Sequence, residues 1–562
     1  MKKIVIICLI FAILVPLSAN AMSKEERVAD ANTVINLFTQ QYGPLKWKEE
    51  YLGINFDELA SKLISDAAAA ATDKDFYRAI SAFLNAFGDA HVSYEIPSSL
   101  EACLPFNTEY FKDGVVITGV NYNVLCQMGG KGHCDDEIPV EEGDLLIAID
   151  GIPVEDVIAS LVVFENNGHE ETSRKFTGSV RLACRPQYIF PDIPSGASVI
   201  TIITKDGTKK DVTLEWISKG FELAEMPPKS AVSYMAKAMT VSQAATNETS
   251  FIKNVFGSYV VEMKKQEADA ASMGSAYPFF PLWDGFETRK TNPYLTGTFA
   301  IGDHNIGFIR INTWSGSVFG PGIKALEEEI EFLNNNTDAI IIDQTNNGGG
   351  NICYTEQIAS FFIFSPQDEL RFQPRANRTW LSNLEYEYEY GKEEFKPHAK
   401  VWLDGLRKAV TSGEYLSKPL PICNLTGKLF PHKNKNQIPV LYTKPVLILV
   451  NELDFSAADM FPAMMQDFGA ATLFGVRTAG AGGNVVGTRF IGNSELAIKI
   501  TQSLAYRINE VPLENGETTH YVENVGATPD IEYEVTLKDY KDGYKSYREA
   551  INSAVMSLIG TK

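Results

Sequence analysis

The chain has 562 residues, more than one ordinary hydrophobic core accommodates, so several domains are expected. Apolar residues make up 45% and aromatic residues 11% of it, which is typical of packed globular domains and excludes a disordered or fibrous protein. The formal net charge of −21 argues against a nucleic-acid partner, because neutralising phosphates requires clustered lysine and arginine.

Residues 1–21 have the pattern of an export signal. Lys2 and Lys3 supply a positive start, and the apolar run from Ile4 to Leu17 is short for a membrane span. Ala19 to Ala21 has the small-x-small pattern of a cleavage site. We therefore predict a secreted or periplasmic protein with no membrane span after signal removal. An uncleaved N-terminal anchor is the alternative.

Removal of the signal leaves an even number of cysteines, which permits disulfides in an oxidising compartment. They are Cys103, Cys126, Cys134, Cys184, Cys353 and Cys423. Their spacing selects no pairing, although Cys126 and Cys134 are close enough to close one loop. The sequence has no C-x-x-C or H-E-x-x-H pattern, so we expect neither a metal site nor a cofactor.

Residues 22–104 are predicted to form an N-terminal helical region, because apolar residues recur at helical spacing in successive segments. The last of these segments runs from Phe76 to Phe87 and is followed by Gly88, a residue typical of helix C-termini. His91 comes directly after this helix end, where the chain becomes extended.

Residues 105–222 change to short β-like runs separated by turn residues. The run from Glu142 to Val154 resembles the core of PDZ modules, with a half-buried strand and a turn at Asp150-Gly151. We predict a PDZ-like domain here, and an unrelated small hairpin is the alternative. Residues 223–295 are the least organised stretch and are interpreted as a linker.

Residues 296–562 show strand–helix alternation, which predicts a mainly parallel sheet. Ala339–Asp343 and Pro445–Val450 are continuously apolar, as expected for strands buried on both faces. An insertion at about 366–440 interrupts this pattern. Within it, three tyrosines alternate with glutamates and are predicted to share one face of a strand: Tyr386, Tyr388 and Tyr390.

Ser456 follows the predicted strand Pro445–Val450, at the point where the chain passes into a helix. Open α/β folds place their sites at the carboxyl ends of such strands, and free N–H groups at a helix N-terminus stabilise developing negative charge. The ordinary alternative is a helix cap, because serine is a preferred N-cap residue and Asp459 resembles its capping partner.

The glycine loop Gly348–Gly350 also follows a buried strand. Such a loop presents backbone N–H groups to a cavity, as an oxyanion hole requires, although a flexible turn is the alternative. A hydroxyl nucleophile also needs a base, and histidine suits that role. Of the seven histidines, His91 is the leading candidate and His520 is its main competitor.

Taken together, these segments resemble the C-terminal-processing (tail-specific) serine peptidase family. The resemblance rests on Ile341-Ile342-Asp343 to Gly350, Val450-Asn451-Glu452, Ser456-Ala457-Ala458, Gln466-Asp467, Gly475-x-x-Thr478-Ala479-Gly480 and Val522 to Asp530. Usual members carry a lysine base after the second glycine of this run, whereas this chain has Ala481 there. The chain is therefore similar to the histidine-using branch of the family.

The resemblance implies a catalytic triad of Ser456, His91 and Glu523. In it Ser456 is the nucleophile, His91 is the general base, and Glu523 fixes the imidazole tautomer and stabilises the imidazolium. Without the resemblance, we would interpret Glu523 as an ordinary glutamate on the protein surface.

The same likeness implies an oxyanion hole made by the amide of Ala457 with one from Gly349 or Gly350. It also implies a homodimer. In addition, it implies that a segment at about 240–290, within the linker, is inhibitory and self-cleaved, as in a zymogen.

The expected fold class is multidomain α/β, with an N-terminal helical region, a PDZ-like β domain and a crotonase/ClpP-like α/β catalytic domain. The expected function is a secreted serine endopeptidase that acts on protein or peptide substrates through an acyl-enzyme. Two alternatives remain open: a non-catalytic peptide-binding protein on the same scaffold, and a scaffold whose PDZ-like module adds a ligand strand to its edge.

Overall fold

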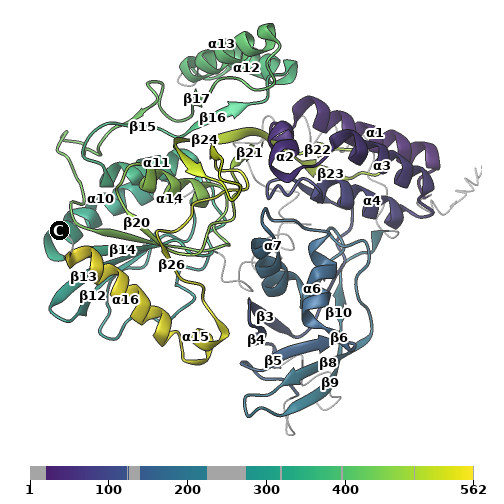
Figure 1. Cartoon of the computed structure of the whole chain (residues 1–562), viewed down its shortest axis with the longest axis horizontal. Helices are drawn as coiled ribbons and strands as arrows, with labels where there is room; N and C mark the ends of the chain where they lie inside the picture. The colour runs from purple at the N-terminus through teal and green to yellow at the C-terminus, as the bar shows by residue number, and fades with distance from the viewer. Residues whose placement is uncertain are drawn as a thin grey trace, which may run out of the picture.

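A computed structural model describes residues 21–122, 125, 139–223, 274–316, 319–393, 396–485 and 488–560. The predicted signal up to residue 20, the Cys126 and Cys134 pair and most of the predicted inhibitory segment lie outside these residues. The N-terminal helices and the PDZ-like domain lie on one side of a larger α/β unit (Figure 1). No helix in the described ranges is long and apolar enough to cross a membrane.

The N-terminal helical region consists of α1 (Lys24–Gln41), α2 (Leu45–Leu52), α3 (Phe56–Ala69) and α4 (Asp73–Asn85). Ser23 and Thr72 begin α1 and α4 with capping boxes. The helices do not form a closed core of their own, because Leu496 and Ile498 from the far end of the chain pack into it. This shared core holds the region against the α/β unit.

A small sheet strengthens this attachment beside His91. It contains β1 (Ser93–Glu95), β23 (Ala497–Lys499) and β22 (Arg489–Phe490), and β1 pairs antiparallel with β23. His91 therefore precedes a strand whose partner comes from the C-terminal part of the chain.

The PDZ-like domain is built on one antiparallel sheet. Its strands, in pairing order, are β3 (Phe106–Phe111), β4 (Gly114–Val120), β5 (Leu145–Ile149), β8 (Ala197–Ile203) and β9 (Lys209–Glu215), with β6 (Ile152–Pro153) on β5. Its helices are α6 (Val154–Val162), α7 (Glu170–Phe176) and the π-helix η1 (Thr177–Arg181). Asp150 and Gly151 both have positive φ, as the predicted hairpin turn requires.

The free edge of β3 is covered by η1. The N–H of Tyr110 donates to Ser179 Oγ (3.0 Å), and Thr108 Oγ1 donates to the carbonyl of Gly178 (2.6 Å). A ligand strand cannot add to β3 at these positions while η1 stays in place. A second small sheet, β10 (Ile217–Lys219), β2 (Glu101–Cys103) and β7 (Cys184–Pro186), carries the disulfide Cys103–Cys184.

The α/β unit is a sheet covered by helices on both faces (Figure 1). In pairing order its strands are β11 (Glu287–Lys290), β12 (Leu295–Ile301), β13 (His304–Arg310), β14 (Ala339–Asp343), β19 (Val446–Val450), β20 (Thr472–Gly475) and β26 (Ile531–Glu532). The strands from β13 to β26 are parallel, as predicted. One face packs against α10 (Phe319–Asn336), α11 (Ile352–Ala359) with η5 (Ser360–Phe362), and α14 (Ala457–Asp467). The other face packs against α16 (Lys545–Gly560), which follows α15 (Leu537–Lys541).

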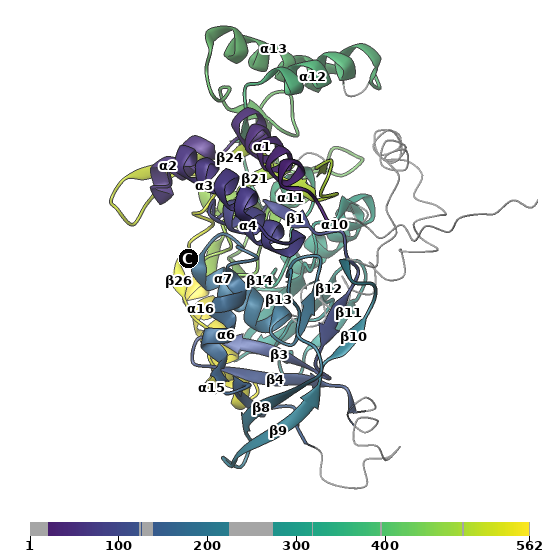
Figure 2. The ribbon, with the colours of Figure 1, turned by 90° about the vertical axis from the view of Figure 1, so that its right-hand side faces the viewer.

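A further sheet flanks this unit, in the order β17 (Leu420–Pro421), β16 (Arg371–Pro374), β24 (Thr501–Pro512) and β21 (Gly483–Val485), with β25 (Thr518–Tyr521) on β24. The insertion also contains the pair β15 (Gln367–Asp368) and β18 (Lys428–Leu429), and the helices α12 (Arg378–Tyr390) and α13 (Lys396–Ser412). Figure 2 shows α12 and α13 projecting as a helical hairpin.

The predicted tyrosine strand is wrong, because Tyr386, Tyr388 and Tyr390 lie on α12. The rings of Tyr386 and Tyr390 are one helical turn apart and contact each other at 5.1 Å between centroids. The intervening glutamates favour helix, the side chain of Asn377 caps its first turn, and α12 lies against α13. Alternation of tyrosine and glutamate is therefore no sign of a strand here.

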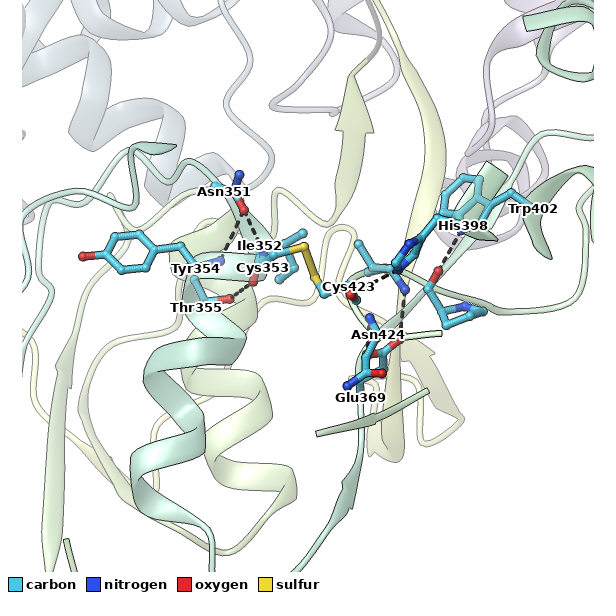
Figure 3. The surroundings of a disulfide bond; sticks show 12 residues. Asn351, Ile352, Cys353, Tyr354, Thr355, Glu369, His398, Trp402, Cys423 and Asn424 are labelled. Carbon is cyan, nitrogen blue, oxygen red and sulfur yellow. Dashed lines mark hydrogen bonds between the residues drawn. A yellow bond between two sulfur atoms is a disulfide. The ribbon is translucent and has the colours of Figure 1, made fainter. Parts of the chain in front are cut away.

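The insertion is tied to the α/β unit by the disulfide Cys353–Cys423 (Figure 3). Cys353 lies in the first turn of α11, directly after the glycine loop. The carboxylate of Glu369 accepts hydrogen bonds from the N–H groups of Ile422 (3.0 Å) and Asn424 (3.2 Å), which flank Cys423. This end of the insertion is therefore fixed beside the glycine loop.

Candidate active site

Ser456 occupies a strained turn between β19 and α14. Its φ of 57° and ψ of −114° lie in a region that residues other than glycine rarely adopt, at a cost of about 1–3 kcal/mol. Its side chain makes no capping hydrogen bond, so capping does not explain the serine. A strained serine at a strand-to-helix turn is the geometry in which hydrolases expose a nucleophile.

The glycine loop packs directly against Ser456. A Cβ on Gly349 would lie 2.4 Å from the carbonyl oxygen of Phe455 and 2.9 Å from Cβ of Ser456, and the φ of Gly349 is 89°. The two segments are also joined by a hydrogen bond from the N–H of Phe455 to the carbonyl of Asn347 (3.0 Å). Only glycine fits at position 349.

The backbone N–H groups of this loop differ in what they bind. The N–H of Gly349 donates to Asn347 Oδ1 (2.9 Å), so it is already used. Within the described ranges, the N–H groups of Ala457 and Gly350 donate no hydrogen bond. Of the three predicted oxyanion donors, these two are therefore free to bind negative charge.

Two buried carboxylates hold the loop in which the usual lysine base is missing. Asp459 accepts from the N–H of Gly480 (2.7 Å) and the N–H of Ala481 (3.0 Å). Glu523 Oε2 accepts from the N–H of Gly482 (2.9 Å). Burial raises the pKa of Asp459 to about 7, although hydrogen bonds to its charged form oppose the rise. Asp459 thus anchors a loop, and it is not the capping partner of Ser456.

His91 is fixed through its backbone by Asp89. The carboxylate of Asp89 accepts from the N–H of His91 (2.8 Å), from the hydroxyl of Tyr42 (2.8 Å) and from Thr501 Oγ1 (3.0 Å). The ring Nδ1 of His91 is buried and has no hydrogen-bond partner. Burial lowers the pKa of His91 below 6.5, the charge of Asp89 opposes this, and Lys48 lowers it further. The imidazole is therefore neutral at pH 7 and able to accept a proton.

Glu523 lies close to His91 but binds another residue. A ring nitrogen of His91 and carboxylate oxygens of Asp89 and Glu523 lie within 4.8 Å of one another. Glu523 Oε1 accepts a hydrogen bond from the ammonium of Lys48, and both side chains are fully buried. Burial and the charge of Asp89 raise the pKa of Glu523, and Lys48 opposes this rise. Because Lys48 already neutralises this group, the cluster does not favour a metal ion.

Sequence reasoning missed Lys48, which lies on α2. Besides Glu523, its ammonium donates to the carbonyl of Gly88 (3.1 Å) and to Asn524 Oδ1. The side chain of Asn524 also donates to the carbonyl of Gly88 (2.6 Å). These contacts join the His91 loop to the Glu523 loop. No local signal marks this lysine, because it stands among lysines and glutamates of an ordinary surface helix.

The structure brings Ser456, Ala457 and the glycine loop together, and it brings His91 close to Glu523. No hydrogen bond between described residues joins His91 to Ser456 or to Glu523. His520, the competing histidine, stacks on Tyr506 (4.3 Å between centroids), and its Nδ1 contacts the carbonyl of Arg507 (2.9 Å). These contacts give His520 a structural explanation.

A different histidine, His169, borders the site. Its Nε2 is buried without a partner and lies 3.1 Å from where a Cβ on Gly480 would be. Burial lowers the pKa of His169 to about 3, and Arg477 and Lys48 lower it further. The neighbouring Gly168 fits against the carbonyl of Ala479. The PDZ-like domain thus supplies part of the wall of this site, which its local sequence did not indicate.

Comparison with known proteins gives family matches for two parts of the chain. Residues 305–533 match the model of peptidase family S41, and residues 100–226 match a PDZ domain. An uncharacterized protein of Chlamydia muridarum is 26% identical over 624 residues, which cover 100% of this chain and 97% of that protein. A protein of Chlamydia pneumoniae is 25% identical, with 96% of this chain and 91% of that protein covered.

Solved structures show the same fold. Mature CPAF complexed with lactacystin aligns with a TM-score of 0.71 at 22% identity, covering 96% of this chain and 99% of that one. Mature CPAF alone gives a TM-score of 0.71 at 23% identity, with 96% and 98% covered. These findings confirm the predicted fold class, with N-terminal helices, a PDZ domain and a peptidase domain.

Proposed function

Because the catalytic domain, residues 305–533, belongs to peptidase family S41, we propose that this chain is a secreted serine endopeptidase with Ser456 as its nucleophile. The observation that carries the proposal is the conformation of Ser456. Its backbone is strained, its hydroxyl is not used as a helix cap, and the unbonded N–H of Ala457 follows it directly. A structural serine needs none of these features, whereas a nucleophile needs all of them.

In the proposed reaction, Ser456 Oγ attacks the carbonyl carbon of the scissile peptide bond while the His91 imidazole takes the hydroxyl proton. The carbonyl oxygen becomes an oxyanion, which the N–H groups of Ala457 and Gly350 bind. The imidazolium then donates its proton to the leaving amine, the C–N bond breaks and an acyl-enzyme remains. In the second half of the reaction the imidazole takes a proton from water, which attacks the acyl carbon. The bond from that carbon to Ser456 Oγ then breaks, the acid product leaves, and the imidazolium returns its proton to Oγ.

Glu523 stabilises the imidazolium in this scheme through its charge. A carboxylate oxygen of Glu523 lies within 4.8 Å of a ring nitrogen of His91. In a buried site, a negative charge at this distance favours the protonated imidazole. Burial and the charge of Asp89 raise the pKa of Glu523, and the ammonium of Lys48 opposes this rise and so favours the charged carboxylate. Asp89 holds the backbone of His91 and adds a second negative charge nearby.

Export of the chain is also part of the proposal. The signal pattern of residues 1–21 supports it, and so do the disulfides Cys103–Cys184 and Cys353–Cys423, which persist mainly in oxidising compartments. We include the homodimer implied by the resemblance, which size measurement in solution tests.

An inhibitory linker has one supporting observation at its described end. The N–H of Gly274 donates to the carbonyl of Asn346 (3.2 Å), and Asn312 Nδ2 donates to the carbonyl of Gly274 (2.8 Å). Asn346 lies three residues before Gly349. Gly274, which lies within the segment at 240–290, therefore contacts the residues just before the glycine loop, and this contact supports an inhibitory role for the segment.

The test compares the purified protein with its Ser456→Ala variant. Both are incubated with a fluorophosphonate probe and with a denatured protein, and the products are analysed by mass spectrometry. We expect labelling on Ser456, cleavage of the added protein and cutting within 240–290, all absent from the variant. Equal labelling and equal fragmentation of both proteins would show a non-catalytic peptide-binding protein instead.

A further inference from the structure

A cavity of about 300 Å³ lies between the PDZ-like domain and the catalytic domain. The PDZ-like domain contributes β3 and α7 to its wall, and the catalytic domain contributes the carboxyl ends of β19 and β20 and residues after β26. Ser456 and His91 do not line it. Its wall contains Asn346 and Glu452, which lie three residues before Gly349 and four residues before Ser456. The cavity is thus separate from the nucleophile and adjoins its loop.

The charges that line the cavity leave an excess of carboxylates. The carboxylates are Glu109, Glu170, Glu171, Glu452 and Glu534, and the cations are Lys112, Arg174 and Lys175. Each cation forms an ion pair: Lys112 with Glu534, Arg174 with Glu155 and Lys175 with Glu109. Five negative charges against three positive ones favour a cationic occupant.

Glu452 is a half-buried carboxylate of this wall, and it forms no ion pair with a described residue. Burial raises its pKa, and the charge of Lys175, which pairs with Glu109, opposes this rise. A cation entering the cavity therefore gains a carboxylate that has no partner of its own.

Aromatic rings form much of the remaining wall. Tyr547 is only 2% exposed, and its hydroxyl makes no hydrogen bond to any described residue, so it offers an acceptor in the cavity wall. Phe279 and Tyr544 lie beside it. The faces of aromatic rings pack against the aliphatic part of a lysine or arginine side chain, and they attract its ammonium or guanidinium group.

From the cavity, its unpaired Glu452 and the buried Tyr547, we propose that this interdomain cavity binds a lysine or arginine side chain of the protein substrate. The inference rests on the proposed peptidase function. A long basic side chain matches both halves of the wall, with its stem on the rings and its charge at Glu452.

The first experiment profiles the cleavage sites of the wild-type protein in a denatured protein mixture. We expect lysine and arginine to be enriched at one fixed position relative to the cut. A peptide with lysine at that position and its norleucine analogue are then hydrolysed by the wild type, by Glu452→Gln and by the control Glu215→Gln, an exposed carboxylate on β9 outside the cavity. We expect the lysine-to-norleucine ratio of kcat/KM to fall at least tenfold in Glu452→Gln and to change less than twofold in Glu215→Gln. A profile without basic enrichment, or equal ratios in all three proteins, would overturn the inference while leaving the peptidase function intact.

Isothermal titration of the same peptides into the Ser456→Ala protein separates the two proposals. Tighter binding of the lysine peptide, lost in Ser456→Ala/Glu452→Gln and reduced in Ser456→Ala/Tyr547→Phe, supports the cavity as the binding site. Equal binding of both peptides contradicts it. If neither peptide is cut by the wild type but the lysine peptide still binds selectively, the peptidase function fails and the binding site stands. Thermal unfolding of each variant confirms that it is folded.

Discussion

Replacing Lys48 with methionine should both destabilise the protein and alter its pH profile. Lys48 and Glu523 form an ion pair in which both side chains are 0% exposed. Removing one partner of a buried pair leaves an uncompensated charge, which typically costs about 3–5 kcal/mol. The stem of methionine keeps most of the packing, so the loss of charge dominates.

The sign of the pH effect follows from the two pKa values that Lys48 lowers. Without its ammonium, the pKa of Glu523 rises further and the pKa of His91 rises as well. Glu523 is charged only above its pKa and His91 accepts a proton only above its own. The acid limb of kcat/KM in Lys48→Met should therefore move to higher pH. The loss of stability should be larger at pH 8 than at pH 5, because a protonated Glu523 needs no partner.

Urea unfolding and pH–rate profiles measure these effects, with Lys46→Met as the control on the exposed face of the same helix. The ammonium of Lys46 lies 4.8 Å from the centre of the Tyr415 ring, so Lys46→Met should change the free energy of unfolding by no more than about 1 kcal/mol. The double variant Lys48→Met/Glu523→Gln should recover at least about 2 kcal/mol relative to the sum of the single variants, but should stay poorly active. Additive single effects, or an unmoved acid limb, would refute the reasoning.

Three further changes test other parts of the site. His91→Ala should lower kcat by at least about 10⁴-fold, and a loss of less than about tenfold would contradict the assignment of His91 as the general base. Gly349→Ala should lower kcat by at least about 100-fold, since its Cβ would collide with the nucleophile turn. Gly285→Ala, which has a similar φ and open space around it, should leave kcat within twofold, and equal losses in the two variants would remove the steric explanation. Cys353→Ser should destabilise the protein by about 4 kcal/mol in urea unfolding, because the disulfide with Cys423 closes a loop spanning 70 residues; a change under 1 kcal/mol would show that the loop stays closed without the bond.

The sequence alone determined the local elements and the position of Ser456 at a strand-to-helix junction. About twenty residues around Ser456 contain a continuously apolar strand, a short polar turn and an amphipathic helix. Periodicity and turn chemistry are therefore enough to predict these elements. The same local reasoning placed His91 after a helix end. It failed for Tyr386 to Tyr390, where an alternating pattern suggested a strand but the residues form the exposed end of the capped helix α12.

Only the tertiary structure decided which of these residues meet. His91 reaches the C-terminal half because β1 pairs with β23 and the N-terminal helices share a core with Leu496 and Ile498. Lys48 meets Glu523 across 475 positions, and the interdomain cavity joins β3 to the loop after β19. Such contacts depend on how separate surfaces pack together, and a pattern that spans a few turns of one helix carries no information about its distant partner.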